Sequence, residues 1–263
     1  MESRRGADKT EKTAKPSLQF DKIAFLYDAL MTGVPYREWI EYVEDILKHF
    51  DHHPKTVLDL CCGTGSASIF LAQKGYDVAG VDLSAPMVEV AKRKAGKKRL
   101  NIDFRAQNAS SLRLGRRFDL VVSLFDSLNY ILESSALQQA FQSVSAHLEP
   151  GALFIFDMNT EVALAGGMFN QSNVGSRSSS VIYDWHSSYD QASRICRVQM
   201  DFLYRSGGGE EKVEAVHYQR AYDEEEIADM LKTAGIEVLD VYDAYTFRKA
   251  AKRSDRVFFI ARK

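Results

Sequence analysis

The sharpest structural signal in the chain is a nine-residue segment, Val57-Leu58-Asp59-Leu60-Cys61-Cys62-Gly63-Thr64-Gly65. Its apolar first half predicts a buried strand, which passes through a glycine turn into a helix over residues 66–74. Glycine lets such a turn bring the backbone within contact distance of a ligand. Because open α/β sheets bind ligands at the carboxyl ends of their strands, the segment predicts a ligand site.

Apolar runs alternate with amphipathic stretches on both sides of this segment. The pattern predicts strands over residues 56–60, 77–82, 102–106, 119–124 and 153–157, and helices over 66–74, 85–95 and 135–147. A helix over 223–234 and two late strands, 237–245 and 256–261, complete the series. Upstream, residues 20–50 predict two helices separated by Gly33-Val34-Pro35. The order predicts an α/β fold with a Rossmann-like, doubly wound sheet that is mostly parallel, with an antiparallel last strand.

Residues 159–220 interrupt this rhythm. Glycine pairs and a serine run at 176–180 punctuate the segment, and aromatic and β-branched residues alternate over 181–190, 192–205 and 212–220. This alternation is typical of antiparallel strands. We therefore expect three units: a flexible tail (1–16), a Rossmann-like domain (17–158 and 221–263), and an inserted antiparallel β-layer (159–220) that covers the active site.

The composition excludes several classes of protein. The 263 residues are 45% hydrophobic, which is enough for a folded core, and a net charge of −2 provides no general field for nucleic acid. Three cysteines, two of them adjacent, make neither a disulfide framework nor a spaced zinc site. No apolar run is long enough to span a membrane, and the start lacks a secretory pattern, so we expect a cytoplasmic protein without a membrane partner. His49, His52 and His53 are attributed to a helix end, and we expect no metal.

The glycine turn by itself also fits a nicotinamide-binding loop. Gly63-x-Gly65 is shared with dinucleotide enzymes, and Ser68 stands where their third glycine would be. Two acids favour a different ligand: Asp59 lies beside the turn, and Asp82 ends the next strand. A carboxylate beside the turn would repel a pyrophosphate but suits a cationic group.

The same segment resembles motif I of the class I S-adenosylmethionine-dependent methyltransferases, with Cys61 in place of the first glycine. Later segments are similar to the family's next motifs in order: 81–84 to motif II, 105–109 to the adenine motif, and 118–130 to motif IV. The resemblance runs from Phe20 to the C-terminus. It is closest to bacterial small-molecule methyltransferases of uncharacterised substrate and to the sugar N,N-dimethyltransferases, which similarly carry a pair like Tyr27-Asp28 ahead of motif I.

This resemblance implies S-adenosylmethionine as the cofactor and assigns residues to it. Asp82 would accept hydrogen bonds from the two ribose hydroxyls, Asn108 would recognise adenine, and Tyr27 would close over the cofactor. The expected cofactor-binding residues are Tyr27, Tyr36, Asp59, Cys61, Gly63, Gly65, Asp82, Leu83, Met87, Gln107, Asn108, Ala109 and Leu124.

The methyl acceptor, a small molecule, is expected above the carboxyl ends of the fourth and fifth strands. Candidates for binding it are Asp126, Asn129, Tyr130, Asn159, Trp185, Tyr218 and Arg220; candidates for catalysis are Asp126, Asn129 and Tyr218, with no general base assigned. The carboxylates of Asp126 and Asp157 would suit an amine acceptor, by positioning it or taking its proton. Strand-end acids also cap neighbouring backbone, so both roles stay open for these two residues. The expected reaction is N- or O-methylation by in-line displacement.

Two alternatives remain for the function, and one for the inserted layer. The protein could be a nicotinamide-dependent oxidoreductase, or a cofactor-binding module without turnover. The aromatic residues of the inserted layer fit an acceptor pocket, and they equally fit a homodimer interface.

Overall fold

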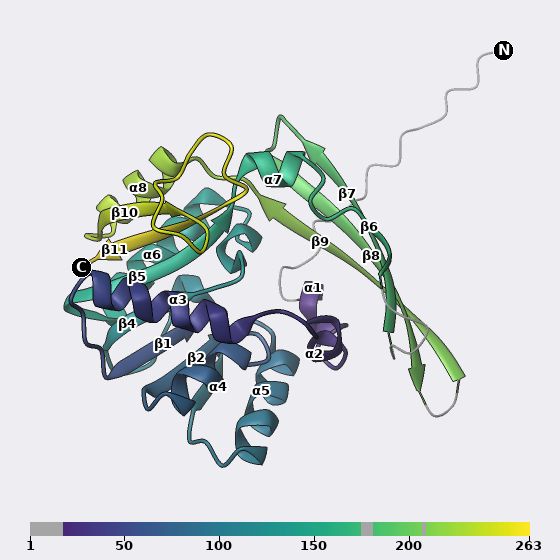
Figure 1. Cartoon of the computed structure of the whole chain (residues 1–263), viewed down its shortest axis with the longest axis horizontal. Coiled ribbons are helices and arrows are strands. Elements are labelled where there is room, and N and C mark those ends of the chain that lie inside the picture. The colour runs from purple at the N-terminus through teal and green to yellow at the C-terminus, as the bar shows by residue number, and fades with distance from the viewer. Residues whose placement is uncertain (1–17, 175–180, 207–208) are drawn as a thin grey trace.

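The computed structural model describes residues 18–174, 181–206 and 209–263, which form two sheets with helices around the larger one (Figure 1). The expected tail (1–16), the serine run 176–180 and Gly207-Gly208 lie outside the described residues. Among the described helices, none is both long and apolar enough to cross a membrane.

The larger sheet has seven strands in the order β10-β11-β5-β4-β1-β2-β3. Only β11 runs antiparallel to its neighbours, and every other pair is parallel. The doubly wound sheet with an antiparallel last strand is thus confirmed. Its strands are β1 (Thr56–Leu60), β2 (Asp77–Asp82), β3 (Asp103–Ala106), β4 (Phe118–Ser123), β5 (Leu148–Asn159), β10 (Glu237–Asp243) and β11 (Arg256–Arg262).

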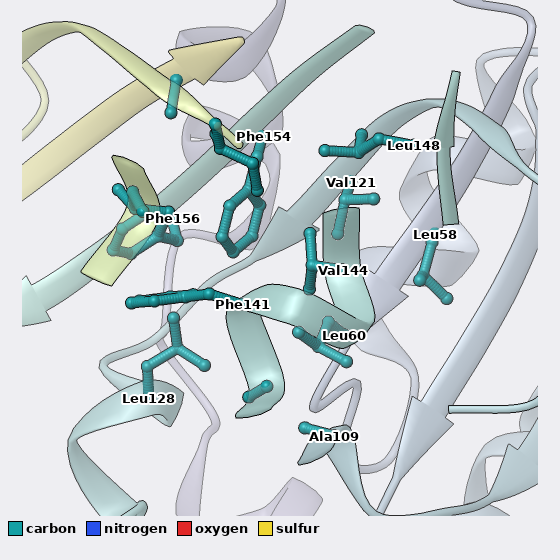
Figure 2. Close-up of a cluster of buried hydrophobic side chains, with 14 of the residues drawn as sticks. Leu58, Leu60, Ala109, Val121, Leu128, Phe141, Val144, Leu148, Phe154 and Phe156 are labelled. Atoms are coloured by element: carbon teal, nitrogen blue, oxygen red, sulfur yellow. The ribbon is translucent and has the colours of Figure 1, made fainter. Parts of the chain in front are cut away.

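Helices pack on both faces of this sheet. On one face, α3 (Tyr36–His49) and α4 (Ser66–Gln73) share an apolar cluster with the central strands. On the other, α6 (Ser134–His147) and α8 (Glu224–Thr233) do the same, and Phe141 of α6 faces Phe154 and Phe156 of β5 (Figure 2). The helix α5 (Ala85–Lys97) packs against Phe104 of β3. Burial on both faces explains why the central strands are continuously apolar.

The second sheet is antiparallel, in the order β6-β7-β8-β9. The three long strands match the predicted ones: β7 (Val181–Asp190), β8 (Ile195–Ser206) and β9 (Gly209–Arg220). Two short elements were not predicted, β6 (Gln171–Val174) and α7 (Glu161–Ala165). They carry little periodic signal because each is at most five residues long.

The N-terminal region differs from the two helices expected over residues 20–50. Only α3 is a long helix; ahead of it stand two single turns, α1 (Leu18–Asp21) and α2 (Tyr27–Leu30), joined by turns. Their apolar residues Ile23, Leu26 and Leu30 pack into one cluster with the second sheet. Contacts with a distant part of the chain therefore replace the regular helix that local periodicity predicted. In Figure 1, α1 and α2 lie between the larger sheet's layers and strands β7 to β9.

Candidate active site

A cavity of about 870 Å³ opens at the carboxyl ends of β1, β2 and β4. Most of its lining comes from three parts of the chain: the turns that follow these strands, the N-terminal elements α1 to α3, and the face of the second sheet that points toward them. This is the edge of the sheet where the sequence predicted a ligand site. The volume is within the range of small-ligand pockets.

The turn after β1 forms one wall through its backbone. Cys61 has a φ of 61° and Gly63 a φ of 53°, so the chain turns back sharply, and both residues line the cavity. A left-handed conformation costs a residue with a side chain roughly 1–2 kcal/mol. Cys61 adopts this unfavourable conformation at the position where motif I of the class I methyltransferases has its first glycine.

Gly65 allows close packing of the turn against Phe104 and Ala91 and is not a lining residue of the cavity. A Cβ built on it would lie 2.7 Å from Cζ of Phe104 and 2.8 Å from Cβ of Ala91. Its φ of 75° adds a second reason for glycine. Gly65 thus lets α4 begin close against β3 and α5, and its expected contact with the cofactor stays a prediction.

Asp82 at the end of β2 meets the requirements of a diol acceptor. Its two carboxylate oxygens each accept one backbone N–H, Oδ2 from Gly63 at 2.8 Å and Oδ1 from Ser84 at 2.8 Å. Each oxygen has a second lone-pair site, and the side chain borders the cavity. Burial raises its pKa, while these backbone hydrogen bonds lower it. The carboxylate is therefore fixed in orientation and retains capacity for two hydroxyls.

Asp59 inside β1 is the most deeply buried acid of this wall. Its side chain accepts a hydrogen bond from Ser68 Oγ at 2.5 Å and is 2% exposed. Burial raises the pKa of Asp59 to about 7, opposed by the hydrogen bond from Ser68. The group thus lies near its titration point at neutral pH, where a cation in the cavity would favour the ionised form.

The N-terminal elements close the cavity from the outside. Tyr27 and Tyr36 both line it, and burial raises the pKa of each phenol. Asp28 holds α2 in place: its Oδ1 accepts from Thr64 Oγ1 at 2.7 Å and from Lys94 Nζ of α5 at 2.7 Å. A second link joins α1 to the turn after β2, where Ser84 Oγ donates to Asp21 at 2.5 Å.

A buried ionic cluster stands at the end of β4. Arg256 of β11 donates to Asp126 at 2.6 Å and to Asp157 at 2.7 Å, and Gln219 of β9 donates to Asp126 at 2.5 Å. Asp157 also accepts the backbone N–H groups of Phe125 and Asp126 and does not line the cavity. Burial raises the pKa of Asp126 to about 6, against the opposing effect of Arg256. Asp126 and Arg256 both border the cavity.

Most residues assigned from the sequence meet at this cavity. Of the expected cofactor residues, every one except Gly65 lines it, and of the acceptor candidates Asp126, Tyr130 and Trp185 do so. Asn129, Asn159, Tyr218 and Arg220 are not among the lining residues. Asn129 is bonded to the backbone of Asn159 and Arg220, which ties β5 to β9.

Strand alternation explains the position of Tyr218. It pairs with Arg197, whereas its neighbour His217 pairs with Val198 and borders the cavity. Successive side chains of a strand point to opposite faces. The sequence predicted the strand β9 correctly. Which of its two faces points toward the cavity depends on the register between β8 and β9, and the sequence does not show that register.

Two important residues of the site were not singled out. Arg256 reaches the cavity because β11 pairs with β5, placing Arg256 opposite Asn159. Phe20 of α1 packs against Tyr130 and His217, with ring centroids 4.9 and 4.4 Å apart. No local motif marks either residue. Within the described residues, no group of three or more His, Cys, Asp or Glu could hold a metal ion.

Comparisons with known proteins agree with the fold. The family model described as a methyltransferase domain matches residues 57–151. A protein of Geobacillus sp. (strain WCH70), provisionally named a methyltransferase, is 31% identical over 248 residues, covering 94% of this chain and all of that protein. A crystal structure of an S-adenosylmethionine-dependent methyltransferase from Clostridium acetobutylicum ATCC 824 has a TM-score of 0.81 at 30% identity, covering 92% and 98% of the two chains.

A more distant similarity covers only part of the chain. A dTDP-3-amino-3,4,6-trideoxy-alpha-D-glucopyranose N,N-dimethyltransferase of Streptomyces venezuelae is 29% identical over 136 residues, which is 51% of this chain and 56% of that protein.

The fold and the comparisons together define a Rossmann-like methyltransferase. The chain belongs to the S-adenosylmethionine-dependent methyltransferase family. It is an enzyme of methyl transfer that uses S-adenosylmethionine, and the comparisons give no support to a nicotinamide-dependent oxidoreductase.

Proposed function

We propose that this enzyme methylates a nitrogen atom of a small molecule that binds between the Rossmann-like domain and the inserted layer (159–220). One observation carries the proposal: a single cavity joins the turns after β1 and β2 to the second sheet, so both reactants fit in one enclosure. The sugar N,N-dimethyltransferase similarity favours nitrogen as the acceptor atom.

In this proposal the cofactor binds at the turns after β1, β2 and β3. Asp82 would hold the ribose hydroxyls, the backbone at Gly63 would approach the methionine part, and Asn108 with Ala109 would border the adenine. The Asn108 oxygen already accepts from the backbone N–H of Ser110 at 2.9 Å, which orients the side chain. S-adenosylmethionine supplies a methyl group activated by a sulfonium, so no metal is needed to activate it.

The protein's task is then to align the acceptor and exclude water. Tyr27 and Tyr36 close the outer side of the cavity, and Asp126 presents a carboxylate that could accept a hydrogen bond from an acceptor amine. Arg256 and Gln219 hold that carboxylate in one orientation. Asp126 therefore acts in this proposal as a positioning group for the nucleophile.

Two further assignments accompany the proposal. The three cysteines are free thiols, which is typical of a reducing compartment, and we place the protein in the cytoplasm. A homodimer through the inserted layer stays a prediction, which sedimentation would test.

Methyl transfer to a pool of small molecules tests the proposed function. The protein would be incubated with methyl-labelled S-adenosylmethionine and a low-molecular-weight bacterial extract, and products would be separated by mass spectrometry. We expect at least one compound to gain a methyl group on nitrogen. A parallel incubation would use the unfractionated extract, which also contains protein and nucleic acid. Label found there only in protein or nucleic acid would contradict the proposal.

A further inference from the structure

The acceptor side of the cavity is built from apolar side chains. The second sheet supplies Trp185 and Met200, and the segment between α7 and β6 supplies Met168 and Phe169. Phe20 of α1 and Ile23 of the following turn complete this wall. Aromatic rings and methionines give broad, adaptable contact area to flat or alkyl ligands. This wall therefore fits a ligand whose body is hydrophobic.

The charges around the cavity disfavour a phosphorylated ligand. Among the described lining residues, Arg256 is the only Lys or Arg, and both Asp126 and Asp157 already bind it. The same lining includes four acids, Asp59, Asp82, Asp126 and Glu133. A diphosphate placed here would lose its hydration near carboxylates without gaining a free cation, which is unfavourable.

Two buried polar atoms in this wall have no hydrogen-bond partner among the described residues: Nε1 of Trp185 and Nδ1 of His217. His217 is 1% exposed, and its Nε2 lies 2.8 Å from the backbone oxygen of Gln19. Because a carbonyl only accepts, Nε2 carries the proton, and Nδ1 is left with a lone pair. Each of the two unpaired polar atoms thus belongs to a residue that lines the cavity, a donor on Trp185 and an acceptor on His217.

The strand register places these two side chains on one face. Trp185 of β7 pairs with Met200 of β8, which pairs with Ala215 of β9, and His217 follows two residues later. Residues two apart on a strand share a face. A buried polar group without a hydrogen-bond partner costs free energy, so a ligand that forms hydrogen bonds with such groups binds with higher affinity.

We infer that the methyl acceptor is a phosphate-free compound with an aromatic or alkyl body, which accepts a hydrogen bond from Trp185 Nε1 and donates one to His217 Nδ1. The inference rests on the proposed function and narrows its substrate class. It separates this enzyme from the dTDP-sugar methyltransferase to which it is similar, because that relative's named substrate carries a nucleotide.

Calorimetry with defined probes tests this inference. The full chain, saturated with S-adenosylhomocysteine, would be titrated with phenethylamine, tyramine and tryptamine as phosphate-free arylalkyl amines, and with dTDP as the nucleotide. We expect at least one amine to bind and dTDP not to displace it. If dTDP binds more tightly than all three amines, or if none of the amines binds, the inference is overturned.

Variants of neighbouring residues test the polar contacts. Trp185→Phe keeps an apolar ring but removes the donor, and we expect it to weaken binding of tyramine, the one probe whose phenol can accept from Trp185 and donate to His217, by roughly two- to tenfold. His186→Gln is the control, because His186 is exposed and lies on the opposite face of the same strand. His217→Phe should weaken binding by a similar factor. Unchanged affinity in folded Trp185→Phe protein would exclude the proposed donor.

Failure of this inference differs from failure of the proposed function. Tight dTDP binding, with methyl transfer to a nucleotide-linked amine in the extract, would overturn the acceptor class and leave small-molecule methylation standing. Absence of any methylated small molecule, with label in a macromolecule, would remove both.

Discussion

Arg256 and Asp126, which are 130 residues apart in sequence, form a buried ion pair with Nη2 and Oδ1 2.6 Å apart. Arg256 stands at the start of the last strand, and Asp126 follows β4 with a left-handed φ of 47°. The pair joins the antiparallel edge of the sheet to the cavity wall. This part of the cavity wall therefore depends on the position of β11 in the sheet.

Removal of Arg256 should destabilise the fold. We expect Arg256→Met to lower the free energy of unfolding by about 3–5 kcal/mol, because Asp126 and Asp157 would lose their shared cation while buried. Arg248→Met is the control; its side chain is largely exposed, so breaking its pair with Asp243 should cost under about 1 kcal/mol. Adding Asp126→Asn to Arg256→Met should restore part of the loss. Chemical denaturation that shows equal effects for the two single variants would contradict the cluster's role.

Asp82 should dominate recognition of the cofactor's ribose. We expect Asp82→Ala to weaken binding of S-adenosylhomocysteine by about 1.5–3 kcal/mol, or roughly ten- to 150-fold, since hydrogen bonds to a charged acceptor are lost. Asp77→Ala changes the other end of β2, where Asp77 pairs with Arg116, and should leave the affinity unchanged. Calorimetry on both variants measures the difference. A folded Asp82→Ala protein with wild-type affinity would refute the assignment.

The pKa of Asp59 predicts a specific pH dependence of stability. Burial raises its folded-state pKa to about 7 from an ordinary 3.8, so between these values the folded protein holds a proton that the unfolded chain releases. The stabilising contribution of the protonated form is complete below about pH 3.8 and is lost as pH rises through 7.

Asp59→Asn lacks this titration. We expect its unfolding free energy, relative to wild type, to increase from pH 5 to pH 8 by on the order of 2–4 kcal/mol and then to level off. Urea denaturation of the apoprotein at several pH values measures the difference. A difference that stays constant over this range would show that Asp59 is ionised throughout.

The salt bridge between Lys94 and Asp28 should control the dissociation rate of the cofactor. Lys94 Nζ contacts Asp28 Oδ1, Thr64 Oγ1 and Ser66 Oγ, so it fastens α2 over the turn after β1. We expect Lys94→Ala to accelerate S-adenosylhomocysteine dissociation by roughly two- to tenfold in stopped-flow measurements. Lys92→Ala on the same helix breaks an exposed pair with Glu89 and serves as the control. Equal dissociation rates for the two variants would show that α2 opens independently of this contact.

The sequence by itself determined the class of fold and the cavity wall at the turns after β1 and β2. The continuous apolar strands, the turn at Gly63 and the acid at Asp82 are local features, because each follows from residues adjacent in the chain. Parallel strands then bring their carboxyl ends to one edge, so local motifs suffice to assemble that wall.

Only the tertiary structure decided which residues of the second sheet and of β11 line the cavity. His217 rather than Tyr218 faces the cavity because of the register between β8 and β9, and a shift of one residue would reverse the two. Arg256 enters the site through pairing with β5, and α1 and α2 are single turns because they pack against the second sheet. These are long-range contacts, whose geometry depends on how distant strands pair, and periodicity within a short window carries no information about that pairing.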